Sequence, residues 1–244
     1  FDKIDYLLDI TGVEELKGIS LGAESGEIGA LTTHAEIVSS KEIKEKLPFI
    51  AAAASSIGST QIRNRGTVGG NINNASPAAD LVNALIALDA SIVLQSKHEK
   101  RELLLSEFIT GPYKTGKNED EMMTEVKVPY IQGEYYDSYQ KVKRRQAVAI
   151  ARINLAVLTD IEDNKFKDIR VAFGSATPTA IRFNEIEKEL ENKNINEIDY
   201  DKIKENTGQE MVDITGERWS TPYKKPVVGN LLKRALQEII KEVQ

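Results

Sequence analysis

The sequence predicts an α+β protein, and three observations support this. Stretches with the alternation of strands and stretches with helical spacing do not follow one another in strict β-α-β order. Three long strand-like runs stand together in the second half: YYDSYQKVK from Tyr135, AIARINLAVLTDIE from Ala149 and FKDIRVAFGSA from Phe166. Charged helical segments follow them. We therefore expect a three-stranded antiparallel meander with helices packed on one sheet face.

The first half shows short strands and helices in turn. The predicted elements, in order, are a strand-like run ending residues 1–10, a helical turn at 13–16, two short strands within 19–31, a helix capped by Thr32 or Thr33 and ending near Ser40, and an Ala-rich helix over 48–56. Pro48 at the start of the last helix suits its first turn.

The remaining elements follow the same reasoning. They are a helix from Pro77 to Ala90 with a leucine stripe, strands at 91–95 and 101–105, a loop over 108–120, a strand over 121–128, and helices at 184–192, 200–212 and 228–243. The turn-like segment PYIQGEYYD after Val128 indicates a domain change, so we expect domains at 1–133 and 134–244.

Composition excludes several classes of protein. The net charge of -6 argues against a nucleic-acid partner. No apolar run approaches the roughly 20 residues of a membrane span, and no signal peptide opens the chain, so we expect a soluble cytoplasmic protein. The absence of cysteine excludes disulfides and thiolate-held zinc or iron-sulfur clusters from this chain. Neither His34 nor His98 stands in a nucleophile-like context. We expect no catalytic side chain and no metal site, so any redox chemistry would belong to a bound organic cofactor.

The stretch from Gln61 to Asp80, QIRNRGTVGGNINNASPAAD, is the most informative. Glycine beside asparagine allows close approach of a ligand to the backbone. Ser76 followed by Pro77 reads as a helix cap and first helical position. A bare-backbone loop running into a helix N-terminus favours an anion such as a pyrophosphate, held by unpaired N–H groups. The stretch therefore predicts a phosphate cradle.

A plainer interpretation stands beside this one. Gly69-Gly70-Asn71 alone is more typical of a hairpin turn. The spacing also differs from the GxGxxG dinucleotide fingerprint, and no Lys-Ser/Thr follows the glycines as in a Walker loop.

The whole string favours the ligand-binding interpretation. QIRNRGTVGGNI with SPAAD behind it resembles the second flavin-contacting loop of the FAD-binding subunits of molybdenum hydroxylases, the family of xanthine, carbon monoxide and nicotinate dehydrogenases. LLDITGVEELKGI, IGALTTHAEI, YQKVKRRQA, FGSATPTAIR and TPYKKPVVGNLLKRAL resemble the family in the same order. The resemblance implies an FAD-binding domain of the vanillyl-alcohol oxidase type (PCMH-type) over 1–133, its first subdomain incomplete, and the family's C-terminal α+β domain over 134–244.

The resemblance also implies roles for particular residues. The FAD pyrophosphate would bind to the main-chain amides around the paired glycines, in the segment Thr67, Val68, Gly69, Gly70 and Asn71. Asp80 would hydrogen-bond the cofactor's hydroxyls, Ile57 and Met123 would pack against the cofactor, and Lys141 would favour a reduced anionic flavin. Residue type alone allows plainer interpretations. Ile57 and Met123 would be ordinary core residues, Asp80 a favourable charge at a helix start, and Lys141 a solvated lysine on a strand.

Two departures from the family pattern stand out. Family chains begin with a further Gly-rich loop of the AGG-Thr/Ser-Asp kind, which this sequence lacks, so we expect the sequence to start late. Lys143, Arg144 and Arg145 form a basic cluster that would face a partner subunit or a dinucleotide phosphate, but Ala147-Val148-Ala149 replaces the acid that many relatives carry after the Arg-Arg pair.

The implied function is the flavoprotein subunit of a molybdenum hydroxylase. A large molybdopterin subunit would oxidise the substrate, a small subunit with 2Fe-2S clusters would relay electrons, and FAD would pass them to NAD or another acceptor, in a hetero-oligomer such as a dimer of heterotrimers. Two alternatives remain: a flavin-free assembly or scaffold subunit, and a stand-alone flavin reductase of the same fold, for which the expected Tyr-Arg and Ser motifs are missing.

Overall fold

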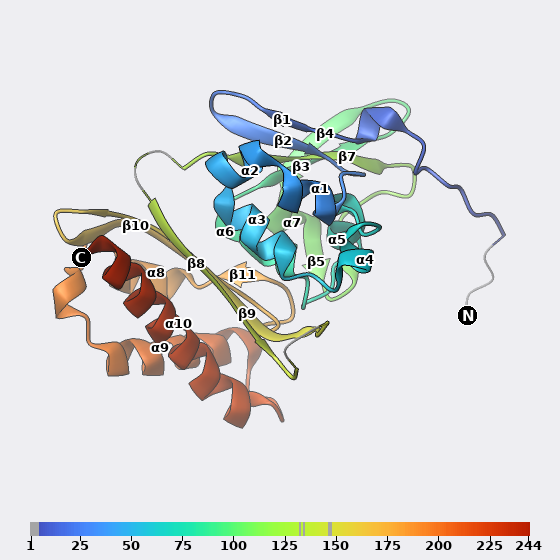
Figure 1. The fold of residues 1–244 in the computed structure, drawn as a ribbon. Helices are drawn as coiled ribbons and strands as arrows, with labels where there is room; N and C mark the ends of the chain where they lie inside the picture. The colour runs from blue at the N-terminus through green and yellow to red at the C-terminus, as the bar shows by residue number, and fades with distance from the viewer. Residues whose placement is uncertain (1–4, 132, 134, 146–147) are drawn as a thin grey trace.

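A computed structural model describes residues 5–131, 133, 135–145 and 148–244. The chain forms two parts that lie against each other, each built on an antiparallel sheet (Figure 1). The predicted mixture of sheets and helices without β-α-β alternation is confirmed. In the described part of the chain, no helix has the length and apolar character that crossing a membrane requires.

The sheet of the first part has five strands in the order β1-β2-β7-β3-β4. The strands are β1 (Ile19–Leu21), β2 (Ser25–Gly29), β3 (Ser91–Gln95), β4 (Lys100–Leu104) and β7 (Met122–Pro129). All five were predicted, with ends shifted by one or two residues. The expected strand before Thr11 is wrong for residues 5–10, whose apolar side chains Tyr6, Leu7 and Leu8 are exposed and meet no sheet.

Helices cover one side of this sheet and separate it from the second part (Figure 1). The helical elements of the first part are η1 (Glu14–Leu16), α1 (His34–Ser39), α2 (Lys41–Lys46), α3 (Pro48–Ser55), α4 (Thr60–Arg63), α5 (Val68–Asn73), α6 (Asp80–Ala87) and α7 (Leu105–Phe108). Thr33 and Glu36 form a complete capping box at the start of α1, as a threonine cap predicts. The loop predicted over 108–120 carries the small ladder of β5 (Ile109–Gly111) and β6 (Lys114–Thr115).

The cradle stretch differs most from its prediction. Residues 68–73 form helix α5 instead of a bare loop, because the Thr67 hydroxyl caps it by accepting the N–H of Gly70. Ala75, in the left-handed region at φ 45°, breaks the chain away from α5. The hydroxyl of Ser76 then accepts the N–H of Ala78 in a local turn, so α6 begins at Asp80 and not at Pro77.

The second part contains a four-stranded sheet in the order β11-β10-β9-β8. Its strands are β8 (Tyr135–Lys143), β9 (Ala151–Glu162), β10 (Lys165–Gly174) and β11 (Ile181–Arg182), and its helices are α8 (Asn184–Leu190), η2 (Ile195–Glu197), α9 (Tyr200–Thr215) and α10 (Thr221–Val243). The predicted meander is confirmed, with the short β11 added at its edge. Helix α10 begins seven residues before the predicted Val228, because it accommodates Pro226 within its length.

Strand β9 shows how the two parts are joined. Ile153, Leu155 and Val157 pack into the core shared with α8, α9 and α10, whereas Ala156 and Leu158 pack into the core of the first part. This alternation is the period of two that a strand imposes on its side chains. Both faces of the second sheet are therefore covered, one by its own helices and the other by α6 and its neighbours.

Candidate functional site

The paired glycines open onto a cavity, which we call the glycine cavity. Its volume is about 480 Å³, and Thr67, Gly69, Gly70, Asn73 and Met123 contribute to its lining. The first four residues belong to α5 or its cap, and Met123 comes from β7. The structure therefore brings together four predicted site residues, Thr67, Gly69, Gly70 and Met123, although Met123 stands 56 positions after Thr67 in the sequence.

The two glycines have different physical roles. A Cβ at Gly69 would lie 2.8 Å from both the carbonyl oxygen and the Cβ of Ala30, so glycine is needed for α5 to pack against the segment after β2. A Cβ at Gly70 would meet only the Thr67 hydroxyl, at 3.1 Å. Gly69 therefore serves packing, whereas Gly70 leaves the cavity open.

The main-chain amides at this point do not form the expected cradle. The N–H groups of Val68 and Gly69 donate to the carbonyls of Thr32 and Ala30, at 2.9 and 2.8 Å. Those of Gly70 and Asn71 donate to the hydroxyl and carbonyl of Thr67. The expectation that these amides are unpaired is wrong, because an antiparallel bridge and the first turn of α5 use them.

Two asparagines of α5 present a contrast. Asn73 is satisfied, since its amide donates to the Gly69 carbonyl at 2.8 Å and lies 3.7 Å from the Met123 sulfur. The side-chain oxygen of Asn71 is not satisfied, since it is buried and accepts no hydrogen bond from any residue that the structure describes. A buried acceptor without a donor is costly unless a ligand satisfies it.

Asp80 and Lys141 lie in a second group, the junction cluster, formed by Asp80, Tyr139, Lys141 and Asn154. The Asp80 carboxylate accepts hydrogen bonds from Lys141 Nζ at 2.5 Å, from the Tyr139 hydroxyl at 3.0 Å and from the Asn154 amide at 3.1 Å. Asp80 stands at the first position of α6, where a negative charge is favoured, and Lys141 and its neighbours come from the second sheet. The cluster thus ties the two parts together.

The junction cluster is shielded from water. The side chains of Asp80 and Lys141 are each 8% exposed. Burial, and then the nearby negative charge of Asp80, raises the pKa of Tyr139 well above its ordinary value, so this hydroxyl remains a donor. Lys141 also donates to the carbonyl of Ser56 at 3.0 Å, beside Ile57, which packs against the core of the first part.

The other predicted residues lie apart from both groups. Val68 is fully buried in the core and does not line the glycine cavity. Lys143, Arg144 and Arg145 are exposed, and Arg145 donates twice to the carbonyl of Val148. Ala147, part of the departure from the family pattern, lies outside the described residues.

The structure adds residues that sequence reasoning missed. Glu121 lines the glycine cavity and accepts two hydrogen bonds from Arg101, at 2.6 and 2.8 Å. Arg101, followed by the N–H of Asn118, lowers the pKa of Glu121 to about 2, so this wall of the cavity is an ion pair. Tyr139 was also missed, although its position two residues before Lys141 on a strand places both on one sheet face.

Comparison with known proteins agrees with this architecture. A family model described as the FAD binding domain in molybdopterin dehydrogenase matches residues 1–131, more than half of the chain, and one described as the CO dehydrogenase flavoprotein C-terminal domain matches residues 137–239. The chain belongs to the FAD-binding medium subunits of the molybdenum hydroxylases. It is therefore an FAD-binding component of an oxidoreductase.

Individual relatives support the same family. The glyceraldehyde dehydrogenase medium chain of Sulfolobus acidocaldarius is 34% identical over 96% of this chain and 83% of its own length. The xanthine dehydrogenase FAD-binding subunit of Escherichia coli is 31% identical over 98% and 82%. Among solved structures, carbon monoxide dehydrogenase from Hydrogenophaga pseudoflava, in a form that lacks the Mo-pyranopterin moiety of its cofactor, superposes with a TM-score of 0.86 at 30% identity, over 96% of this chain and 81% of that one.

Proposed function

We propose that this chain carries FAD at the glycine cavity and collects electrons from an iron-sulfur partner subunit for transfer to NAD or another acceptor. The observation that carries the proposal is the open face of Gly70 beside the Thr67 hydroxyl, on a cavity of about 480 Å³. That volume lies within the usual range of cofactor pockets.

The residues present fit part of an FAD molecule. Thr67 offers a hydroxyl, Gly69 and Gly70 offer backbone without side chains, and Met123 offers an apolar contact. Asn71 does not line the glycine cavity, and its side-chain oxygen is buried, so it would contact a cofactor only after α5 moves. The amides of Val68 and Gly69 donate to residues 30–32, and those of Gly70 and Asn71 donate to Thr67. Diphosphate binding through these amides would therefore require both the bridge to residues 30–32 and the first turn of α5 to open.

Bound FAD would supply two-electron oxidation and reduction. The chain's own residues would bind, orient and shield it. Lys141 is proposed to lie at the flavin end, but the Asp80 carboxylate offsets its charge. Lys141 would therefore stabilise a reduced flavin only if the Asp80 carboxylate accepted hydrogen bonds from other donors instead, such as the cofactor hydroxyls.

The partner assignment rests on cysteine content and on family membership. The chain has no cysteine, so a thiolate-held cluster must be on another chain. Relatives are described as medium chains or subunits. We propose a small 2Fe-2S subunit and a large molybdopterin subunit as partners, in a dimer of heterotrimers in the cytoplasm. We also propose residues 1–133 and 134–244 as the two domains, because β7 ends at Pro129 and β8 begins the second sheet at Tyr135.

The experiment is flavin reconstitution of the full-length subunit with Gly70→Trp. An indole at this position would fill the glycine cavity, so we expect the flavin absorption band to be lost while assembly with the partner subunits continues. Gly12→Trp is the matched control, because a Cβ there meets nothing within 4 Å. A full-length, folded wild-type subunit that binds no flavin would refute the proposal and favour a flavin-free scaffold.

A further inference from the structure

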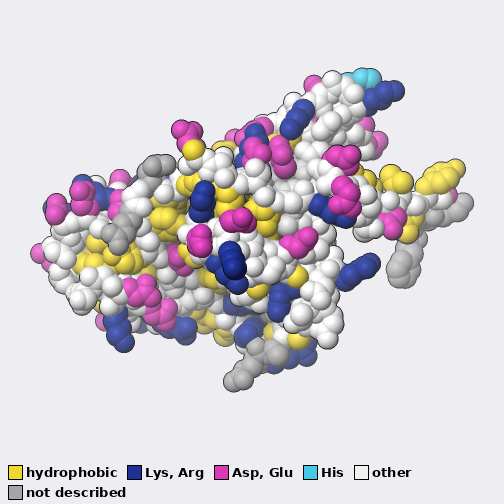
Figure 2. Space-filling view, turned by 45° about the horizontal axis from the view of Figure 1, so that its top comes forward, with side chains coloured by type: hydrophobic (Ala, Val, Ile, Leu, Met, Phe, Trp, Pro, Cys, Tyr) yellow, Lys and Arg dark blue, Asp and Glu magenta, His cyan; other side chains and the backbone are white. Residues whose placement is uncertain are grey.

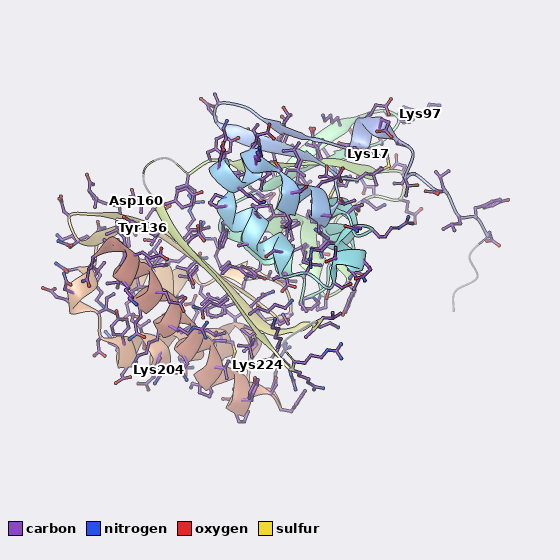
Figure 3. The ribbon with its side chains drawn as sticks, in the orientation of Figure 1. Lys17, Lys97, Tyr136, Asp160, Lys204 and Lys224 are labelled. Atoms are coloured by element: carbon purple, nitrogen blue, oxygen red, sulfur yellow. The ribbon has the colours of Figure 1, made fainter. Side chains whose placement is uncertain are left out.

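A second cavity, the basic cavity, lies where the start of α10 meets the second sheet. Its volume is about 590 Å³, and its lining includes Arg152, Ser175, Arg218, Trp219, Tyr223 and Lys224. Arg152 stands at the start of β9 and Ser175 directly follows β10, so both come from the same end of the sheet. Figure 3 shows Lys224 on α10 near this end. The basic cavity shares no lining residue with the glycine cavity.

Three cations face the basic cavity without a counter-charge. None of the described residues that line it is an aspartate or a glutamate. In the described part of the chain, Arg152, Arg218 and Lys224 form no ion pair: Lys224 donates to the Ser175 carbonyl, Arg218 Nε donates to the Thr215 carbonyl at 3.2 Å, and the Arg152 guanidinium lies 5.9 Å from the centre of the Tyr223 ring. Elsewhere the surface differs, since Figure 2 shows basic and acidic side chains interspersed on the face it presents.

The positive charges are close enough to act on one another. Burial, followed by the charges of Arg218 and Arg152, lowers the pKa of Lys224. The N-terminus of α10 adds the positive end of a 23-residue helix, and its first turn has no acidic residue. Acids are the side chains favoured at such a helix start, so this arrangement costs stability unless an external anion binds there.

The backbone at the cavity is strained and firmly held. Ser175 has a φ of 59°, in the left-handed region that few non-glycine residues occupy. Its N–H donates to the Pro77 carbonyl at 2.8 Å, and its hydroxyl lies within hydrogen-bond distance of the Pro77 and Ala151 carbonyls. Strain of this kind persists only where neighbouring contacts impose it, and it is concentrated at binding sites.

The wall beside the cations is aromatic. Trp219, the only tryptophan of the chain, is 90% exposed, and Tyr223 is 47% exposed. Exposing a whole indole to water is unfavourable, and its face is suited to stacking on a planar ring. The cavity therefore combines a site for a multiply charged anion with a platform for a flat group.

We propose that the basic cavity binds a phosphorylated small molecule with a planar ring, of the nucleoside monophosphate class. Arg152, Arg218 and Lys224 would hold the phosphate, and Trp219 and Tyr223 would stack on the ring. This site is separate from the glycine cavity and does not depend on flavin binding.

The test uses Trp219 as the reporter. Titrating the purified protein with guanosine monophosphate should give a saturable change in tryptophan fluorescence. Inorganic phosphate and guanosine should each bind at least about tenfold more weakly, because each makes only part of the contacts. The variant Arg152→Gln/Arg218→Gln should weaken nucleotide binding by about tenfold or more. Lys241→Gln removes one positive charge from the far end of α10 and should leave binding unchanged.

Other results would overturn the proposal. An unchanged fluorescence signal at high nucleotide concentration, or equal affinity in the wild type and the double variant, would remove the site. Guanosine or phosphate binding as tightly as the nucleotide would refute the ligand class. Arg218 is exposed and Arg152 is half-buried, and neither forms an ion pair within the described residues, so circular dichroism of the double variant should match the wild type. Arg152→Gln alone provides a milder version of the same test.

Discussion

The glycine cavity and the junction cluster are both predicted cofactor sites, but they are built by different means. The glycine cavity is defined mainly by backbone: Gly69 fits against Ala30, and Thr67 caps α5 three residues before Gly70. The junction cluster is defined by charge, with Asp80 and Lys141 at 2.5 Å and 61 positions apart in the sequence. The glycine cavity depends on the absence of side chains, whereas the junction cluster depends on the pairing of the Asp80 and Lys141 side chains. The two sites should therefore respond differently to substitution.

The largest effect should come from breaking the junction cluster. Lys141→Met leaves the Asp80 carboxylate buried at the start of α6 without its cation. Removing one partner of a buried pair typically costs about 3–5 kcal/mol, so urea unfolding should show a loss of that order. The matched control is Lys188→Met, because Lys188 and Glu185 form an exposed pair, 69% and 73% accessible, for which a change of at most about 1 kcal/mol is expected.

A double substitution separates pairing from packing. Lys141→Met with Asp80→Asn removes both charges and should recover part of the lost free energy of unfolding, because the uncompensated carboxylate is gone. If the double variant is as unstable as the sum of the single ones, the two residues do not act as a pair, and the junction cluster has been misinterpreted.

The next effect concerns the glycine cavity and should separate its two glycines. Gly69→Ala places a methyl group 2.8 Å from the Ala30 carbonyl oxygen and should cost about 1–3 kcal/mol of folding free energy. Gly70→Ala meets only the Thr67 hydroxyl and should change stability by less than about 1 kcal/mol. Thermal unfolding of the two variants measures the difference. Equal destabilisation would mean that Gly70 also serves packing and not an open cavity.

The same contrast explains what could be predicted from sequence. The strands from β1 to β4, β7 and the cap of α1 depend on neighbouring residues, so alternation and a threonine before an apolar run were sufficient to locate them. The strand expected before Thr11 and the helix start expected at Ser76-Pro77 were wrong. The family resemblance singled out the stretch around the paired glycines as the predicted site, but the expectation that its main-chain amides are unpaired was wrong. Thr67 caps a helix, and the N–H groups of Val68 and Gly69 donate to carbonyls of residues 30–32. The sequence around the glycines does not show that these distant residues are the acceptors.

The junction cluster lay beyond such reasoning for a related reason. Asp80 and Lys141 were each singled out, but their pairing depends on how α6 packs against the second sheet. Asn154 and Tyr139 complete the set of donors from two different strands. Only the sheet register, with Lys141 opposite Asn154, brings these residues together. The alternation of residues within each strand does not determine the register between β8 and β9, so it could not predict that Lys141 lies opposite Asn154.

Asp137 sharpens the comparison, since it is a carboxylate on the same strand as Lys141 but without a cation. Alternation places Asp137, Tyr139 and Lys141 on one face of β8. In the described part of the chain, Asp137 makes no ion pair. Burial, followed by the negative charge of Glu242, raises its pKa from 3.8 to about 6. Asp80 is a buried carboxylate whose charge is balanced by Lys141, whereas Asp137 lacks such a cation and its charged form is disfavoured.

The last predicted effect follows from the raised pKa of Asp137, and its dependence on pH has a definite sign. Below pH 3.8 the Asp137 carboxyl is protonated in both folded and unfolded chains, and it has no cost. As the pH rises to about 6, the unfolded chain loses the proton more readily, so the free energy of unfolding falls, and above that pH the deficit is constant. Asp137→Asn should therefore stabilise the protein by about 1–3 kcal/mol at neutral pH and have little effect near pH 3.5, roughly the lower limit of the window. Urea unfolding at several pH values measures this, with the exposed Asp120→Asn as control. A stabilisation by Asp137→Asn that does not change with pH would mean that the carboxylate charge is not its cause.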